Sequence, residues 1–161
     1  MNRIDGFVLA LLWLLFLIST PCLAERQFAP EGAGLRAGLV VDPDQLHVGA
    51  HVHVGDIAPG LMFVPNVELG FGSDLLVVAT SAELDYRFPT VIGAWHPYVG
   101  LGAGPVFVST KYDDDTGVGL SLQVGLIHKS TGRGGFPFLE FKLGLEDYPD
   151  IKLTIGWTFG S

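Results

Sequence analysis

A two-residue alternation of polar and apolar side chains is the feature that most limits what this chain can fold into. It is clearest in residues 46–55, LHVGAHVHVG, where odd positions hold only histidine and glycine and even positions hold only apolar residues. Side chains on a β-strand alternate between its two faces, so one face of this segment is apolar and the other is not. The pattern predicts a strand whose two faces meet different environments.

The same alternation recurs along the chain after residue 24, interrupted repeatedly by turn-forming sequences. We expect eight strands, at residues 34–41, 46–55, 61–72, 75–88, 95–108, 117–129, 136–145 and 151–159. No segment in this part of the sequence shows a sustained helical stripe of apolar residues. Eight antiparallel strands with short links close naturally into a barrel.

Two kinds of barrel fit such strands: a soluble barrel with an apolar interior, and a transmembrane barrel with an apolar exterior. Glycine decides between them, because it recurs on the polar face of nearly every strand. Glycine weakens a strand that faces water, whereas the narrow interior of an eight-stranded barrel needs small residues beside large ones. Charged residues are also scarce, at 16% against about 25% in typical soluble domains.

The sequence therefore predicts an all-β fold, an eight-stranded antiparallel up-and-down transmembrane barrel. Its interior is polar and rich in glycine, and its exterior is apolar and faces lipid. Aromatic residues near strand ends are expected to form girdles at the membrane interfaces; they are Tyr86, Phe88, Trp95, Tyr98, Tyr148, Trp157 and Phe159. A secreted soluble barrel that binds an apolar ligand remains the alternative.

The first 24 residues have the layout of a secretory signal peptide. Arg3 precedes an apolar run of 12 residues from Phe7 to Ile18, and small residues lead to Ala24. That run is too short to span a bilayer as a helix. We expect residues 1–24 to be cleaved and residues 25–161 to form one barrel domain. Cys22 is the only cysteine, so we expect no disulfide in the mature chain.

The chain resembles the eight-stranded barrel families of bacterial outer membranes, and is similar to the membrane domain of OmpA and to OmpX and OmpW. The segments that match these families most specifically are WHPYVGLGAGPVF and the C-terminal KLTIGWTF. In these families the last strand carries an assembly signal of one polar residue, alternating apolar residues and a terminal aromatic. The matching positions are Lys152, Leu153, Ile155, Trp157 and Phe159. Two departures are Thr154, where glycine is frequent, and the residues Gly160 and Ser161 after the aromatic.

The resemblance implies export to the outer membrane with both chain ends in the periplasm. The first, third, fifth and seventh links then face outward, and these links carry the acidic residues Asp42, Asp44, Asp74, Asp113 to Asp115, Glu146, Asp147 and Asp150. It also implies a monomeric, non-enzymatic protein without a cofactor, with a structural or surface-interaction role. The expected partners are outer-membrane lipid, lipopolysaccharide and the barrel-assembly machinery, which would recognise the C-terminal strand. The net charge of −8 without a basic patch argues against nucleic acid.

The polar face predicts a network of ion pairs and hydrogen bonds inside the barrel, because a buried charge is costly unless it is paired. The predicted members are Arg36, His51, His53, Glu68, Glu83, Asp85, Arg87, Glu140, Lys142 and Lys152. His51 and His53 also place two imidazoles on one face, which is the beginning of a transition-metal site. Since the spacing supplies no third ligand, no metal site is predicted.

A catalytic alternative is a lipid-modifying hydrolase. His128 and Ser130 share a strand face, as do the histidine and serine of the lipid A deacylase PagL, another eight-stranded barrel that also uses a glutamate. Here Thr131 follows the serine where that enzyme has asparagine, and Glu140 is expected on the opposite face. We therefore predict no catalytic residue. The acidic links DPD and YDDDTG lack the spacing of a calcium loop and are interpreted as solvated turns.

Overall fold

The computed structural model describes residues 31–41, 44–128, 134–146 and 151–160. The predicted signal peptide, residues 1–24, lies outside this range. Among the described residues, no helix has the length and apolarity needed to cross a membrane.

The described chain is built from strands. They are β1 Gly32–Val40, β2 Gln45–His53, β3 Asp56–Ala58, β4 Leu61–Gly72, β5 Leu75–Arg87, β6 Trp95–Thr110, β7 Asp114–His128, β8 Phe136–Glu146 and β9 Ile151–Gly160. The eight long strands coincide with the eight predicted ones to within a few residues at each end. The short strand β3 was not predicted; it lies in the link between β2 and β4 and pairs with β4.

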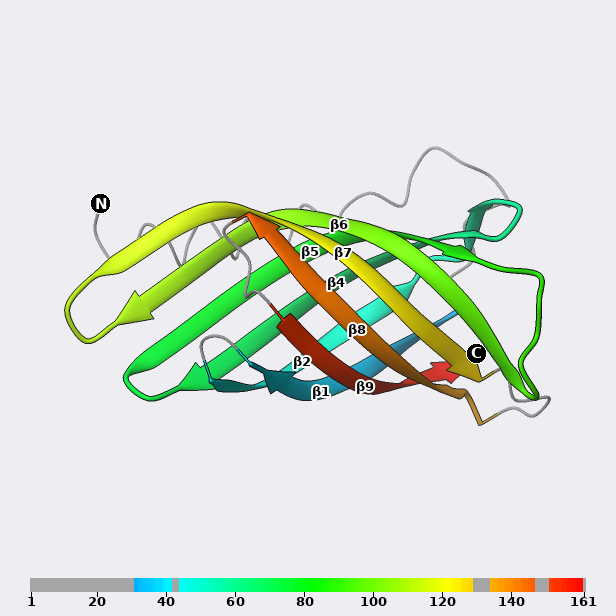
Figure 1. The fold of residues 1–161 in the computed structure, drawn as a ribbon, viewed down its shortest axis with the longest axis horizontal. Coiled ribbons are helices and arrows are strands. Elements are labelled where there is room, and N and C mark those ends of the chain that lie inside the picture. Colours follow the sequence, from blue (N-terminus) through cyan, green and yellow to red (C-terminus); the bar gives the residue numbers. More distant parts are fainter. Residues whose placement is uncertain (1–30, 42–43, 129–133, 147–150, 161) are drawn as a thin grey trace.

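The long strands close into a ring of antiparallel neighbours. Along the sheet they follow the order β2, β1, β9, β8, β7, β6, β5 and β4, and an additional ladder between β2 and β4 completes the circle. Figure 1 shows the result as an elongated barrel whose strands cross the long axis obliquely. The predicted all-β, eight-stranded antiparallel up-and-down barrel is confirmed.

The two faces of each strand lie in different surroundings, as the alternation predicts. In β1, Arg36 is 3% exposed and points into the barrel, whereas its neighbour Leu35 is 61% exposed on the outside. The same contrast holds around the barrel, with Leu101 of β6 and Ile155 of β9 among the most exposed apolar side chains. The polar side chains are inside, and the outer wall is apolar.

Interior glycines lie opposite large interior side chains on the neighbouring strand. Gly38 faces His47 across the ladder between β1 and β2, and a Cβ added at Gly38 would come within 2.6 Å of the imidazole Nε2. The same pairing joins Gly34 to His51, Gly49 to Glu68, Gly100 to Asp85, Gly125 to Tyr98 and Gly156 to Phe138. Glycine therefore makes room in a lumen barely wide enough for side chains.

The interior also contains two apolar clusters, so the prediction of a polar, glycine-rich lumen was incomplete. One cluster contains Met62, Val64, Tyr98, Ile127 and Phe138, and the other contains Val77, Ala79 and Val106. Their places on the strands put the first cluster towards the end that holds the β5–β6 link and the second towards the end that holds the β6–β7 link. The buried charged side chains lie between the two.

Candidate functional site

The middle of the lumen holds a cluster of charged side chains contributed by five strands. Its members are Arg36 on β1, Glu68 on β4, Glu83 and Asp85 on β5, Glu140 and Lys142 on β8, and Lys152 on β9. None of these residues is more than 3% exposed. We call this set the central network.

Arg36 is the hub of the central network. Its Nη1 atom lies 3.2 Å from Glu68 Oε1, 3.5 Å from Glu83 Oε2 and 3.8 Å from Glu140 Oε1. One guanidinium therefore contacts carboxylates from three different strands. Because it is planar and permanently charged, it can hold these groups in a fixed arrangement.

Two lysines complete the pairing. Lys142 contacts Glu83 and also places its Nζ atom 3.5 Å from Glu140 Oε1, and Lys152 contacts Glu68. Each of the three glutamates thus lies beside Arg36 and beside one lysine. This mutual pairing is what allows six charged groups to remain buried, since an isolated buried charge would cost several kcal/mol.

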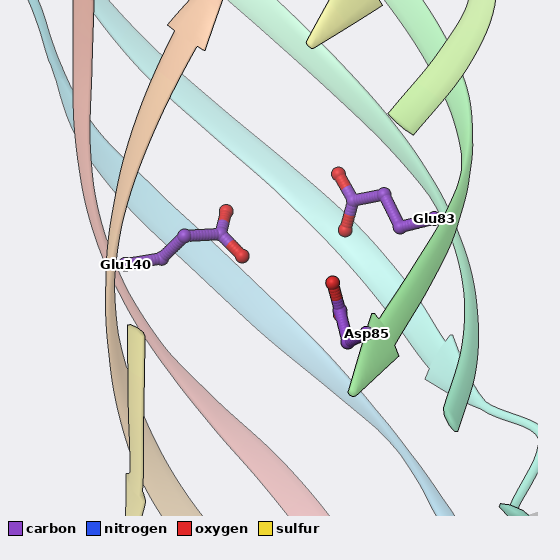
Figure 2. A group of neighbouring side chains, drawn as sticks. All are labelled: Glu83, Asp85 and Glu140. Carbon is purple, nitrogen blue, oxygen red and sulfur yellow. The ribbon is translucent and has the colours of Figure 1, made fainter. Parts of the chain in front are cut away.

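Asp85 is held differently from the glutamates. It accepts a hydrogen bond of 2.9 Å from Gln123 Nε2. Figure 2 shows its carboxylate beside those of Glu83 and Glu140, and the three groups each offer an oxygen within 4.8 Å of the others. Lys142 and Arg36 already supply positive charge to the two glutamates. We therefore interpret the three acids as part of the central network.

Two of the histidines of β2, His51 and His53, lie against residues of β9 and β8. The Nε2 atom of His51 is hydrogen-bonded to Thr158 Oγ1 at 2.8 Å, and its ring meets Phe138 edge-on at 5.2 Å between centroids. His53 packs edge-on against His51 at 5.5 Å and against Phe136. Within the described residues, no group of three potential metal ligands includes either histidine.

Arg87 was predicted as a member of the interior network, but the structure places it apart from that network. Its Nη2 atom lies 3.0 Å from Asp56 Oδ2, and both side chains are partly exposed. This pair ties the end of β5 to the short strand β3. The alternation gave the face of Arg87 correctly, and its place one residue before the end of the predicted strand 75–88 could have set it apart from the central network.

The prediction for Tyr98 was also wrong, because this side chain lies inside the barrel. It was predicted as an interfacial aromatic, but it is 3% exposed and faces the lumen, where its hydroxyl donates a hydrogen bond of 2.8 Å to Glu140 Oε2. It shares strand parity with Gly100 and Gly102, and this signal could have placed it inside. Among the other predicted girdle residues, Tyr86, Phe88, Trp157 and Phe159 are exposed, Trp95 is partly exposed, and Tyr148 lies outside the described residues.

Of the residues suggested for catalysis, His128 and Glu140 are described, and each has other partners. His128 packs edge-on against Trp95, with 5.0 Å between ring centroids. Glu140 is engaged inside the barrel by Tyr98, Arg36 and Lys142. Ser130 lies outside the described residues.

One of the comparisons with known proteins found a similar fold, and none found a family. No family model and no curated protein matches the chain. Among solved structures, the chain is similar to the N-terminal β-barrel domain of Pseudomonas aeruginosa OprF, with a TM-score of 0.56 and 13% sequence identity. The match covers 81% of this chain and 100% of that domain. The likeness is one of fold.

Proposed function

We propose that this chain is a non-enzymatic outer-membrane β-barrel protein with a structural or surface-interaction role. The proposal rests on the distribution of polar and apolar side chains, which is the reverse of that in a soluble protein. The central network is almost fully buried, while apolar side chains such as Leu35 and Leu101 are about 60% exposed. Soluble proteins rarely expose a contiguous apolar patch of more than a few hundred Å². A wall of this kind is suited to lipid, and the likeness to the OprF barrel domain supports the same reading.

The interior argues for a closed barrel rather than an open pore. The central network links side chains of five strands across the lumen, and an apolar cluster lies on each side of it. The buried acids are engaged by cations, by Tyr98 or by Gln123. In the described part of the lumen these acids are thus occupied by partners of the same chain, which supports a non-enzymatic role.

We expect the partners of the protein to bind its outer wall. Outer-membrane lipid and lipopolysaccharide would contact the exposed apolar residues of all eight long strands. The C-terminal strand β9 presents Leu153, Ile155, Trp157 and Phe159 on its outer face. These are the residues that would be recognised by the barrel-assembly machinery, in keeping with the family signal that they match.

Fractionation and gel mobility test the proposal together. The expected result is a protein in the outer-membrane fraction that migrates faster on a detergent gel before boiling than after it. A protein recovered in the soluble periplasmic fraction without this mobility shift would refute the proposal. It would favour the secreted soluble barrel instead.

A further inference from the structure

Three buried polar side chains are neighbours at the point where the ladder between β2 and β4 ends. His51 and His53 on β2 and Asn66 on β4 are each 5% exposed or less. His51 lies directly opposite Asn66 in the last pair of the ladder, and the Cβ atoms of such a pair are about 4.5–5.5 Å apart. His53 follows on the same face of β2, with its ring centroid 5.5 Å from that of His51. His51 is thus adjacent to both other side chains.

Each of these three side chains has one polar atom that is left over. The Nδ1 atoms of His51 and His53 and the Oδ1 atom of Asn66 are buried, and none has a hydrogen-bond partner among the described residues. Buried polar atoms are normally hydrogen-bonded, so three adjacent exceptions call for a physical explanation. An amide oxygen and an unprotonated imidazole nitrogen both have a lone pair that a cation can accept.

The opposite ends of two of these side chains are held in place. His51 Nε2 is hydrogen-bonded to Thr158 Oγ1 at 2.8 Å, and when Nε2 is the donor, Nδ1 keeps its lone pair. Asn66 Nδ2 donates a hydrogen bond of 3.3 Å to the carbonyl oxygen of Val64, which leaves Oδ1 available. Histidines that bind a metal almost always use their second ring nitrogen in a bond of this kind, because it fixes the tautomer and the orientation of the ring.

The spacing of the two imidazoles suits a single ion. A metal bonded at about 2.0–2.1 Å to one nitrogen of each ring, in tetrahedral geometry, holds the ring centroids roughly 5–5.5 Å apart. The centroids of His51 and His53 are 5.5 Å apart. No histidine, cysteine or acid joins them as a third ligand among the described residues, so the third ligand is the amide oxygen of Asn66. The sequence pattern could not supply it, because Asn66 comes from the opposing strand.

The charge of the surroundings also favours a cation. The ring of Phe138 contacts His51 on one strand and the guanidinium of Arg36 on another, at 5.2 and 5.4 Å, so the central network lies close by. That network contains four carboxylates and three basic side chains, and its formal charge is therefore −1. A net negative charge in a buried region attracts a positive ion.

We propose that His51, His53 and Asn66 bind one late first-row transition-metal ion, such as Zn²⁺ or Cu²⁺, through Nδ1, Nδ1 and Oδ1. Imidazole nitrogen is a ligand that suits both ions. The ion would join β2 to β4 just where their ladder ends, since the next residue of β4 in that direction is Pro65, which has no backbone N–H. This site goes beyond the proposed function and requires only the folded barrel.

The test uses the barrel refolded in detergent without a histidine tag, stripped of metal with EDTA, and with its fold verified by the mobility shift. Isothermal titration with ZnCl₂ should find one ion per barrel, and the electron paramagnetic resonance spectrum of the Cu²⁺-loaded barrel should show coupling to two nitrogens. Asn66→Asp replaces the amide oxygen by a carboxylate and should tighten Zn²⁺ binding about tenfold. A variant that merely perturbs the fold would not bind more tightly.

A matched pair of variants tests the histidines. His53→Gln should weaken Zn²⁺ binding about tenfold or more. His47→Gln is the control, because His47 is equally buried and its Nε2 is hydrogen-bonded to Thr154 Oγ1 at 3.2 Å, but Gly49 takes the place of a second histidine two residues on. It should leave binding unchanged. Equal losses from both variants, a folded barrel that binds no Zn²⁺, or a Cu²⁺ spectrum without nitrogen coupling would overturn the site. Zn²⁺ binding by a protein found in the soluble fraction would refute the proposed function alone.

Discussion

Arg36 and Leu35 are neighbours in β1, yet they lie in opposite environments. Arg36 is 3% exposed among three carboxylates, and Leu35 is 61% exposed on the outer wall. The inner face depends on particular partners, because each buried charge must meet an opposite one at close range. The outer face has no such requirement, because apolar burial is non-directional. Specificity in this barrel is therefore concentrated inside, while the outer wall needs only to be apolar.

The largest expected effect comes from removing the hub of the central network. Arg36→Met should lower the free energy of unfolding by about 3–5 kcal/mol, because it leaves buried carboxylates without their shared cation. Urea titration of the refolded barrel in lipid vesicles, monitored by tryptophan fluorescence, measures this change. Leu35→Met on the outer face is the matched control and should cost less than about 1.5 kcal/mol. Equal losses from the two variants would remove the contrast between the faces.

A charge placed on the outer wall tests whether that face of the barrel excludes charged side chains. Val52 points outward from β2 and is 36% exposed. Val52→Arg should cost about 2–4 kcal/mol in lipid vesicles if the position lies near the midplane of the bilayer. Val52→Leu, measured by the same urea titration, should be close to neutral. A neutral arginine at this position would count against a lipid-facing wall.

The glycine pairing predicts an intermediate effect. Gly125→Ala should destabilise the barrel by about 1–3 kcal/mol, because the new Cβ would collide with the Tyr98 ring on the opposing strand. Gly134→Ala is the control, since a Cβ there would meet nothing within 4 Å. In a double-mutant cycle, Tyr98→Leu should relieve much of the cost of Gly125→Ala. Strict additivity of the two changes would show that the ring is not the cause.

The smallest effect is expected for the ion pair outside the central network. Arg87 and Asp56 have side chains 18% and 31% exposed, so water screens their attraction. Arg87→Met should lower the free energy of unfolding by about 1 kcal/mol or less in the same titration. A loss as large as that of Arg36→Met would show that depth in the lumen does not set the value of an ion pair.

The alternation predicted the strands and their faces because the two-residue period follows from backbone geometry alone. A residue of β2 such as His51 was therefore correctly placed on the polar face before any partner was known. The same rule gave the face of Arg87 and, through Gly100 and Gly102, could have given that of Tyr98. It could not show which inward side chains meet across the lumen, nor that the unpredicted strand β3 would bring Asp56 to Arg87.

The eight long strands, the polar interior and the apolar wall could be predicted without a structure, because they depend on the order of neighbouring residues. Which inward residues meet depends on the folded barrel as a whole. Arg36 reaches Glu68 across 32 residues of sequence, and His51 reaches Thr158 across 107. Such contacts depend on the stagger between strands and on closure of the ring between β2 and β4. Strand stagger arises from the packing of the whole barrel and has no signature in a single strand.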